Sequence, residues 1–267
     1  MDDADLALAR PHARTWLERH GASGREPSRV LTARIAVRKR RTEREMLHLG
    51  LLCVALIAFV LVTEFASLSL VINGQDVLNV VVMGAFYLLM AALTWWGSRS
   101  QRRAERRIAA SLPQRAAHGT GTGAVRVLGV PFVVASAATY VGGVAIGAVL
   151  AFGADTVTDR LIAAIFACGT AIFAVITAVV AAEEVRRGAL AEDEESLAAD
   201  DLLRVEDAHR VPPFPAVLAA IYAVNVTDTA TIATFGGFAV VTILLWAAVY
   251  VQDTRRKLVT PDGAVTA

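Results

Sequence analysis

Glu64 is the side chain of this chain that could best support chemistry, because it is the acidic or basic residue set deepest in an apolar stretch, LLCVALIAFVLVTEFASLSLVI. A carboxylate in hydrocarbon is costly, and such groups usually face a bundle interior, often on an ion or proton pathway. About eight residues separate Glu64 from Ile72, which places it ~12 Å or less from the end of the stretch. We expect a structural pair with Arg160 or Asn79; a carboxylate that titrates during transport is the alternative.

Two motifs resemble binding sites but lack parts that the chemistry needs. Gly119-Thr-Gly-Thr-Gly123 could cradle a phosphate, yet it has neither a preceding strand nor the lysine of a nucleotide loop, so we interpret it as a linker. Asn225-Val-Thr227 matches a glycosylation acceptor but lies too close to a predicted span for use. Neither motif predicts a site.

The segment 183–210 contains ten acidic residues against four arginines. Its cluster Glu192–Glu195 lacks the alternating ligands and the glycine of a calcium loop. We therefore expect a solvated helix whose modest apolar edge (Leu197, Val205, Ala208) packs on a partner or on the basic 28–44 helix of the same chain.

No set of residues specifies a reaction or a metal site. The two cysteines, Cys53 and Cys168, both lie in apolar stretches and are expected to be unpaired thiols. The five histidines are scattered outside the predicted spans and outer turns, so no nucleophile and base can be assembled. The sequence thus predicts no enzymatic activity, no cofactor and no metal.

Small residues gather in the stretch 127–152. Gly143-x-x-x-Gly147, preceded by Gly142, lets another helix approach the backbone closely. Close packing within the bundle is the expected role, and a face for a homo-oligomer is the alternative.

These features lie in a chain with the composition of a membrane protein. Hydrophobic residues make up 55% and charged residues 19%, with a mean hydropathy of +0.52, whereas soluble domains average about 45 to 50% and 25%. Crossing a bilayer takes about 20 apolar residues. Six stretches meet or approach that length: Leu49–Ile72, Val77–Trp96, Val127–Phe152, Leu161–Ala182, Val211–Thr227 and Thr231–Val251.

The basic residues predict the orientation. If the six stretches cross as three hairpins, 25 of the 26 Lys and Arg residues lie on one side, which should be the cytoplasm. Only Arg160 is opposite. The stretch 211–227 is short and opens with Pro212, Pro213 and Pro215; without it, five spans would leave the C-terminus outside.

The predicted fold class is therefore all-α, a polytopic membrane bundle of six transmembrane helices with cytoplasmic helical extensions. Its parts are a basic N-terminal region (1–46), hairpin 1 (47–96), a basic linker (97–126), hairpin 2 (127–182), an acidic connection (183–210), hairpin 3 (211–251) and a cytoplasmic tail (252–267). In the N-terminal region, Pro11 should interrupt a first helical piece, and Ser28 should cap a basic helix that runs into the first span.

Two functions fit this architecture. Long charged connections exceed what joining helices requires, which favours a non-catalytic subunit or scaffold in a bacterial plasma membrane, with both termini cytoplasmic. Its expected partners are the lipid bilayer and a protein or a second copy of the chain, and not nucleic acid. The alternative is a small-solute or ion transporter that uses Glu64.

Overall fold

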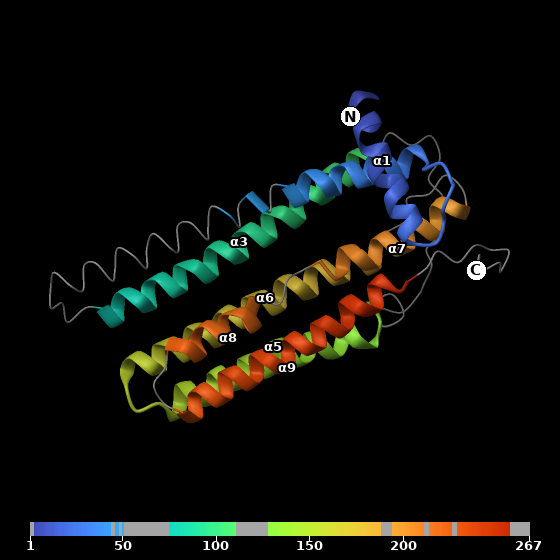
Figure 1. Cartoon of the computed structure of the whole chain (residues 1–267). Coiled ribbons are helices and arrows are strands. Elements are labelled where there is room, and N and C mark those ends of the chain that lie inside the picture. The colour runs from blue at the N-terminus through green and yellow to red at the C-terminus, as the bar shows by residue number, and fades with distance from the viewer. Residues whose placement is uncertain are drawn as a thin grey trace.

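Helices make up all the regular secondary structure in the described part of the chain, which confirms the all-α prediction there. A computed structural model describes residues 3–43, 46–47, 50, 75–110, 128–187, 194–210, 214–225 and 229–256. The helices are α1 (Asp3–Arg19), α3 (Gln75–Ala110), α5 (Val130–Gly153), α6 (Val157–Arg186), α7 (Glu194–Ala208), α8 (Phe214–Asn225) and α9 (Thr229–Thr254), with a further helix at 29–43. Long helices run side by side, and α1 and α7 lie together at one end (Figure 1).

Three of the described helices, not six, are long and apolar enough to cross a membrane. They are α5, α6 from Asp159, and α9, with 24 to 28 residues and hydropathies of 1.9 to 2.4. The prediction of six such helices was therefore wrong for this part of the chain. The first predicted span lies almost wholly outside the described residues, and the second forms the start of α3, which continues into a basic sequence.

The predicted stretch Val211–Thr227 contains the short helix α8, whose proline start fits its sequence. α8 has 12 residues, or about 18 Å at 1.5 Å per residue, against ~30 Å of hydrocarbon. Pro215 lies in its first turn, where a missing amide hydrogen costs no helical bond. The ring of Phe214 lies 5.3 Å from that of Phe173 in the middle of α6, so α8 begins partway along the bundle.

α5 and α6 form a hairpin with a capped turn. Thr156 precedes α6, and its hydroxyl accepts a hydrogen bond from the amide of Asp159 at 3.0 Å, which satisfies one of the free donors at the helix start. Gly129 precedes α5 with φ 82°, a left-handed conformation that glycine adopts without strain. Pro131 then occupies the first turn of α5.

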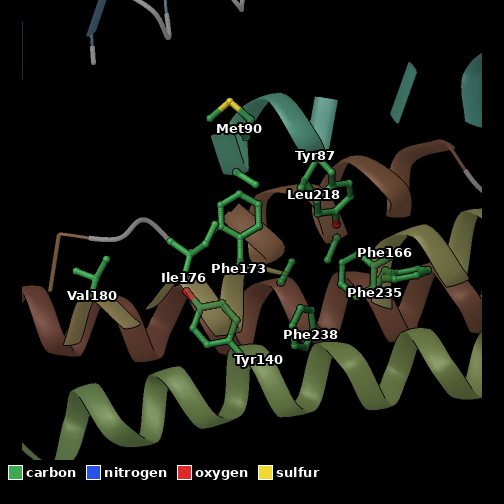
Figure 2. Packing of buried hydrophobic residues seen from close by; sticks show 13 residues of the cluster. Tyr87, Met90, Tyr140, Phe166, Phe173, Ile176, Val180, Leu218, Phe235 and Phe238 are labelled. Atoms are coloured by element: carbon green, nitrogen blue, oxygen red, sulfur yellow. The ribbon is translucent and has the colours of Figure 1, made fainter. Parts of the chain in front are cut away.

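Aromatic side chains fill the centre of the bundle. Phe166, Phe173 and Phe235 are almost completely buried, and Phe166 meets Phe235 edge to face at 5.1 Å between ring centroids. Tyr87 brings α3 into the same cluster, and Leu218 brings in α8 (Figure 2). Two hydroxyl contacts add to this packing, since Thr177 Oγ1 donates to Tyr140 Oη at 2.7 Å and Trp246 Nε1 donates to Thr139 Oγ1 at 2.9 Å.

Glycines permit the closest helix contacts. A Cβ on Gly147 would lie 2.9 Å from the carbonyl oxygen of Ala163 in α6, and one on Gly143 would lie 2.9 Å from Thr170. A Cβ on Gly169 would lie 2.3 Å from the ring of Tyr87. α6 therefore contacts both α5 and α3 through positions where the helix surface lacks a side chain.

The helices α1, 29–43 and α7 form a small folded unit, which we call the polar head. Its apolar centre contains Trp16 and Leu17 of α1, Leu31 and Ile35 of the second helix, and Leu203 of α7. α1 runs through Pro11 without a break, contrary to the predicted interruption, and its buried face continues on both sides of the proline, at Ala9 and Ala13.

A second apolar cluster attaches the polar head to the bundle. Ala208 of α7 packs with Leu128 and Phe132 at the start of α5, Ala181 of α6 and Val249 of α9. The ends of the three described helices that are long enough to cross a membrane therefore meet the head directly (Figure 1).

Candidate functional site

The densest set of functional side chains is a buried network of arginines and carboxylates between the polar head and the bundle. The 29–43 helix begins at a cap, where Ser28 Oγ accepts a hydrogen bond from the Leu31 amide at 3.2 Å, as the sequence predicted. From that start, Arg34 and Arg38 are four residues apart and share a face. On α7, Asp200 and Asp207 are two turns apart and share a face. This anionic face of α7 contacts the cationic face of the 29–43 helix.

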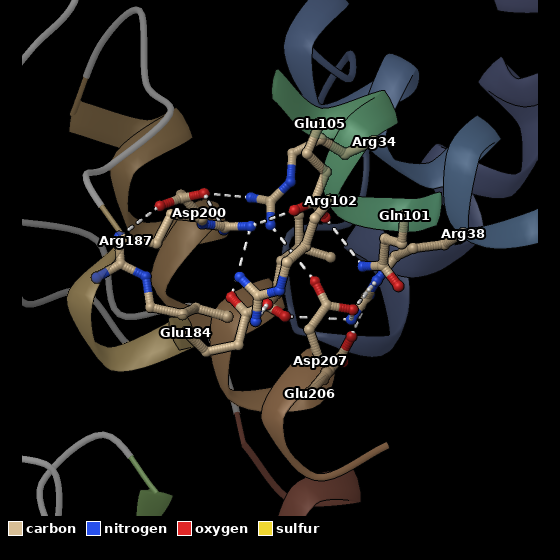
Figure 3. A network of polar contacts seen from close by, with 12 residues as sticks. Arg34, Arg38, Gln101, Arg102, Glu105, Glu184, Arg187, Asp200, Glu206 and Asp207 are labelled. Atoms are coloured by element: carbon tan, nitrogen blue, oxygen red, sulfur yellow. Dashed lines mark hydrogen bonds and ion pairs between the residues drawn. The ribbon is translucent and has the colours of Figure 1, made fainter. Parts of the chain in front are cut away.

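Arg34 and Arg38 are both buried in this contact. Arg34 pairs with Asp200, and its Nη2 lies 3.6 Å from Asp207 Oδ2. Arg38 donates from Nε to Asp207 Oδ1 at 2.9 Å, from Nη1 to Glu206 at 2.5 Å and from Nη2 to the carbonyl oxygen of Leu203 at 3.1 Å. Arg34 is 2% exposed and Asp200 1%, which makes this an interior network rather than a surface one (Figure 3).

The same network extends to α3 and α6. Arg187, just after α6, donates to Glu105 of α3 at 2.7 Å and to Asp200 of α7 at 3.1 Å. Arg102 of α3 lies 2.6 Å from Glu183 and 3.2 Å from Glu184. Arg187 therefore joins three helices that are far apart in sequence.

Pairing favours the ionised forms of Glu206, Asp207 and Arg38. Burial alone would raise the pKa of Glu206, but hydrogen bonding to His20 and the charge of Arg38 outweigh it and set the pKa at about 2. Burial likewise opposes ionisation of Asp207, yet Arg38 and Arg34 lower its pKa. Burial would lower the pKa of Arg38, but the charges of Asp207 and Glu206 raise it.

Arg34 is less well compensated than Arg38. Its pKa is lowered from the ordinary value, first by burial and then by the charge of Arg187, against the charge of Asp200. A buried charge that loses a partner is strongly destabilising. Arg34 is therefore the position at which loss of one carboxylate should matter most.

Two histidines make contacts with both ring nitrogens, His209 between the head and the bundle and His20 within the head. His209 Nδ1 lies 2.6 Å from Asp253 Oδ2 of α9 and Nε2 lies 2.7 Å from the carbonyl oxygen of Leu128, while the ring stacks on Phe132 at 4.3 Å. His20 contacts the carbonyl oxygen of Trp16 at 2.8 Å and Glu206 at 3.1 Å. Every partner of these ring nitrogens is a carbonyl or carboxylate oxygen, which can only accept a hydrogen bond.

Of the residues singled out from the sequence as an intramembrane polar group, the structure describes the side chain of Arg160. Glu64 is outside the described residues, and Asn79 is described only as a backbone position in α3. Arg160 is exposed, and its Nε donates to the carbonyl oxygen of Ala154 at 2.8 Å, closing the α5–α6 turn. The pairing predicted for Glu64 stays a prediction.

The predicted packing glycines lie in the bundle. Gly143 and Gly147 face α6, and a Cβ on Gly142 would meet Phe238 of α9 at an ordinary 3.6 Å. Among the described residues, Cys168 is a free thiol, and no group of three or more His, Cys, Asp or Glu side chains is placed to hold a metal ion.

The acidic segment differs from the solvated helix that we expected. Asp200, Arg204 and Asp207 are each at most 3% exposed. The charged face of α7 packs on the basic helix, whereas Ala208 of the predicted apolar edge packs on the ends of α5, α6 and α9. The signal in the sequence was the matching spacing of opposite charges on two helices, but spacing alone does not identify which helices meet.

Comparisons with protein families, curated proteins and solved structures found no match to this chain.

Proposed function

We propose that this chain is a multi-pass membrane protein without chemistry of its own, and that the polar head is its module for engaging a partner. The observation that carries the proposal is the network of Arg34, Arg38 and Arg187, which fixes the head to α3 and α6. A segment that only connected spans would not need three helices, an apolar centre and buried ion pairs. Rigid attachment of the head to the bundle would hold a binding surface on the head in a fixed orientation.

The proposed membrane topology is six crossings with both termini in the cytoplasm of a bacterium, as the basic residues predict. Asp253 near the end of α9 contacts His209 beside the head, which supports placing that end of α9 on the side of the N-terminal region. Arg210 lies at the head end, whereas Thr229 begins α9 at the opposite end (Figure 1). The chain thus passes along the bundle between them, which supports a sixth crossing.

Quantitative copurification from native membranes in mild detergent tests the scaffold proposal. Deleting residues 1–27 would remove Trp16 and Leu17 from the centre of the head, so a surface change is the better variant. We propose Glu18→Lys on the exposed face of α1, with Asp155→Lys in the exposed α5–α6 turn as the control, since both reverse one charge at opposite ends of the molecule.

The proposal expects a protein that copurifies with the wild type in constant ratio, is retained by Asp155→Lys and is lost from Glu18→Lys. Thermal unfolding of the purified variants should be unchanged. Absence of any such protein, or its retention by variants throughout the exposed surface of the head, would contradict the proposal.

A second candidate, solute or ion transport, rests on α8. A helix that begins beside Phe173 in the middle of α6 resembles the interrupted helices of transporters, where backbone groups at a break line a binding site. Purified protein in liposomes tests it: solute flux driven by a proton or ion gradient, and lost in Glu64→Gln, would favour transport over a scaffold.

A further inference from the structure

A cleft of about 650 Å³ lies where the polar head meets the end of α9. Its walls come from α1, the 29–43 helix, the residues that end α7 and the last two turns of α9. The apolar sequence of α9 ends at Val251, and Tyr250 before that end and Asp253 and Thr254 beyond it line the cleft. The cleft therefore opens at the level where the hydrocarbon ends and lipid headgroups begin.

The lining carries an excess of positive charge. Four cations, Arg19, Arg38, Lys39 and Arg210, line it together with two anions, Glu206 and Asp253. Both anions already bind side chains of the chain itself, since Glu206 pairs with Arg38 and His20 and Asp253 with His209. With four cations against two anions, the lining carries a formal net positive charge.

Lys39 is the cation best placed to reach a ligand. Its side chain is 44% exposed, its Nζ lies 2.8 Å from His12 Nε2, and the nearest carboxylate oxygen, on Glu43, is 3.9 Å away. Arg19 and His12 are exposed on the facing helix α1. Guanidinium, ammonium and imidazole donors on two helices form a set that suits the oxygens of a phosphate group.

The membrane side of the cleft suits a lipid. Tyr250 is 71% exposed, and tyrosine favours the boundary between hydrocarbon and water. Ile243 lies two turns deeper on the same face of α9 and is 48% exposed. A headgroup held in the cleft would thus have an exposed apolar face below it for its acyl chains.

We propose that this cleft binds a phosphate ester, presented by the headgroup of an anionic phospholipid in the leaflet next to the polar head. A cluster of basic residues beside a membrane helix attracts anionic headgroups. Here a walled pocket adds donors at fixed positions, which selects for a phosphate group over diffuse negative charge. The inference does not depend on the partner proposed for the head.

The test uses the full-length protein in nanodiscs of phosphatidylcholine containing a minor fraction of phosphatidic acid. The readout is the ratio of phosphatidic acid to phosphatidylcholine that stays bound after extraction into detergent, measured by native mass spectrometry. The variant is Arg19→Gln with Lys39→Gln, and His12→Asn with Lys39→Gln provides a second one that keeps Arg19. The matched control is Arg103→Gln with Arg106→Gln, two exposed arginines of α3 that do not line the cleft.

We expect enrichment of phosphatidic acid on the wild type and on the control. Loss of two basic contacts should reduce that ratio by about thirtyfold in Arg19→Gln with Lys39→Gln, and by less in His12→Asn with Lys39→Gln. An unchanged ratio in both cleft variants, or an equal fall in the control, would overturn the proposal, because the attraction would then be that of any basic surface.

A competition distinguishes the source of the phosphate. Enrichment that excess glycerol 3-phosphate does not displace assigns the site to a lipid. Binding of glycerol 3-phosphate without lipid enrichment assigns it to a soluble phosphate ester and keeps the phosphate chemistry. Binding of neither overturns the proposal.

Discussion

Asp207 and Asp201 are the same residue type on the same helix, but their carboxylates have different surroundings. The side chain of Asp207 is 2% exposed and faces Arg34 and Arg38, whereas that of Asp201 is 56% exposed and lies 3.9 Å from Arg204. A buried arginine without its carboxylate is an uncompensated charge in a medium that solvates it poorly. Asp201 is therefore a matched control for Asp207, and comparing the two measures how much burial of the carboxylate contributes to stability.

The Asp207→Asn variant should lower the free energy of unfolding of the polar head by about 3 to 5 kcal/mol, because Arg34 and Arg38 stay buried with less negative charge. Asp201→Asn should cost at most about 1 kcal/mol, as for other exposed pairs. Thermal unfolding and limited proteolysis of the purified variants measure the difference. Equal stabilities would show that the network contributes little.

Glu206 should make the head sensitive to acid. Its pKa is about 2 in the folded protein against an ordinary 4.5, so it stabilises the fold above pH 4.5 and this contribution is lost as the pH falls from 4.5 to 2. The shift corresponds to about 3 kcal/mol. The wild type should thus be more stable than Glu206→Gln near neutral pH, and the two should converge toward about pH 2. A difference that does not depend on pH would contradict this assignment.

At the scale of helices, the α5–α6 contact depends on positions without side chains. A Cβ at Gly147 would lie 2.9 Å from the Ala163 carbonyl oxygen, whereas a Cβ at Gly236 in α9 would meet nothing within 4 Å. Backbone cannot move aside as the end of a long side chain can. The same substitution at these two positions should therefore have opposite consequences.

Gly147→Ala should destabilise the bundle by about 1 to 3 kcal/mol, because one extra carbon forces the two helices apart. Gly236→Ala should be neutral or slightly stabilising, since alanine loses less conformational freedom in a helix interior. The measurement is thermal unfolding in one detergent under identical conditions. A loss in Gly236→Ala as large as in Gly147→Ala would mean that the effect comes from the helix itself and not from the contact.

Local patterns predicted the helices well and their meeting points poorly. The cap at Ser28 and the proline start of α8 follow from neighbouring residues, and so both could be predicted. The Arg34–Asp200 pair joins residues 166 apart, and helical spacing contains no information about such distant partners. The half-length of α8 likewise depends on where its first turn packs, beside Phe173, which its own apolar sequence does not reveal.

At the scale of the molecule, the two ends of the bundle differ in chemistry. One end carries the polar head, with its buried arginines and the cleft, and the other carries the α5–α6 turn with the exposed Arg160 and Asp155. Since basic segments are retained in the cytoplasm during insertion, this asymmetry predicts which end faces which side. This prediction of orientation does not depend on any residue outside the described part of the chain.

Single cysteines placed at the two ends should report the orientation, once Cys53 and Cys168 have been replaced by serine. Glu18→Cys in the head should resist a thiol reagent that cannot cross membranes when it is applied to intact cells, whereas Asp155→Cys in the α5–α6 turn should react. Ala264→Cys should also resist, because α9 ends beside the head through the contact of His209 with Asp253. All sites should react after the membrane is permeabilised. Labelling at Glu18→Cys with protection at Asp155→Cys would show the opposite orientation to the one proposed. Labelling at both Ala264→Cys and Asp155→Cys would instead support five crossings, with the C-terminal tail on the other side of the membrane from the head.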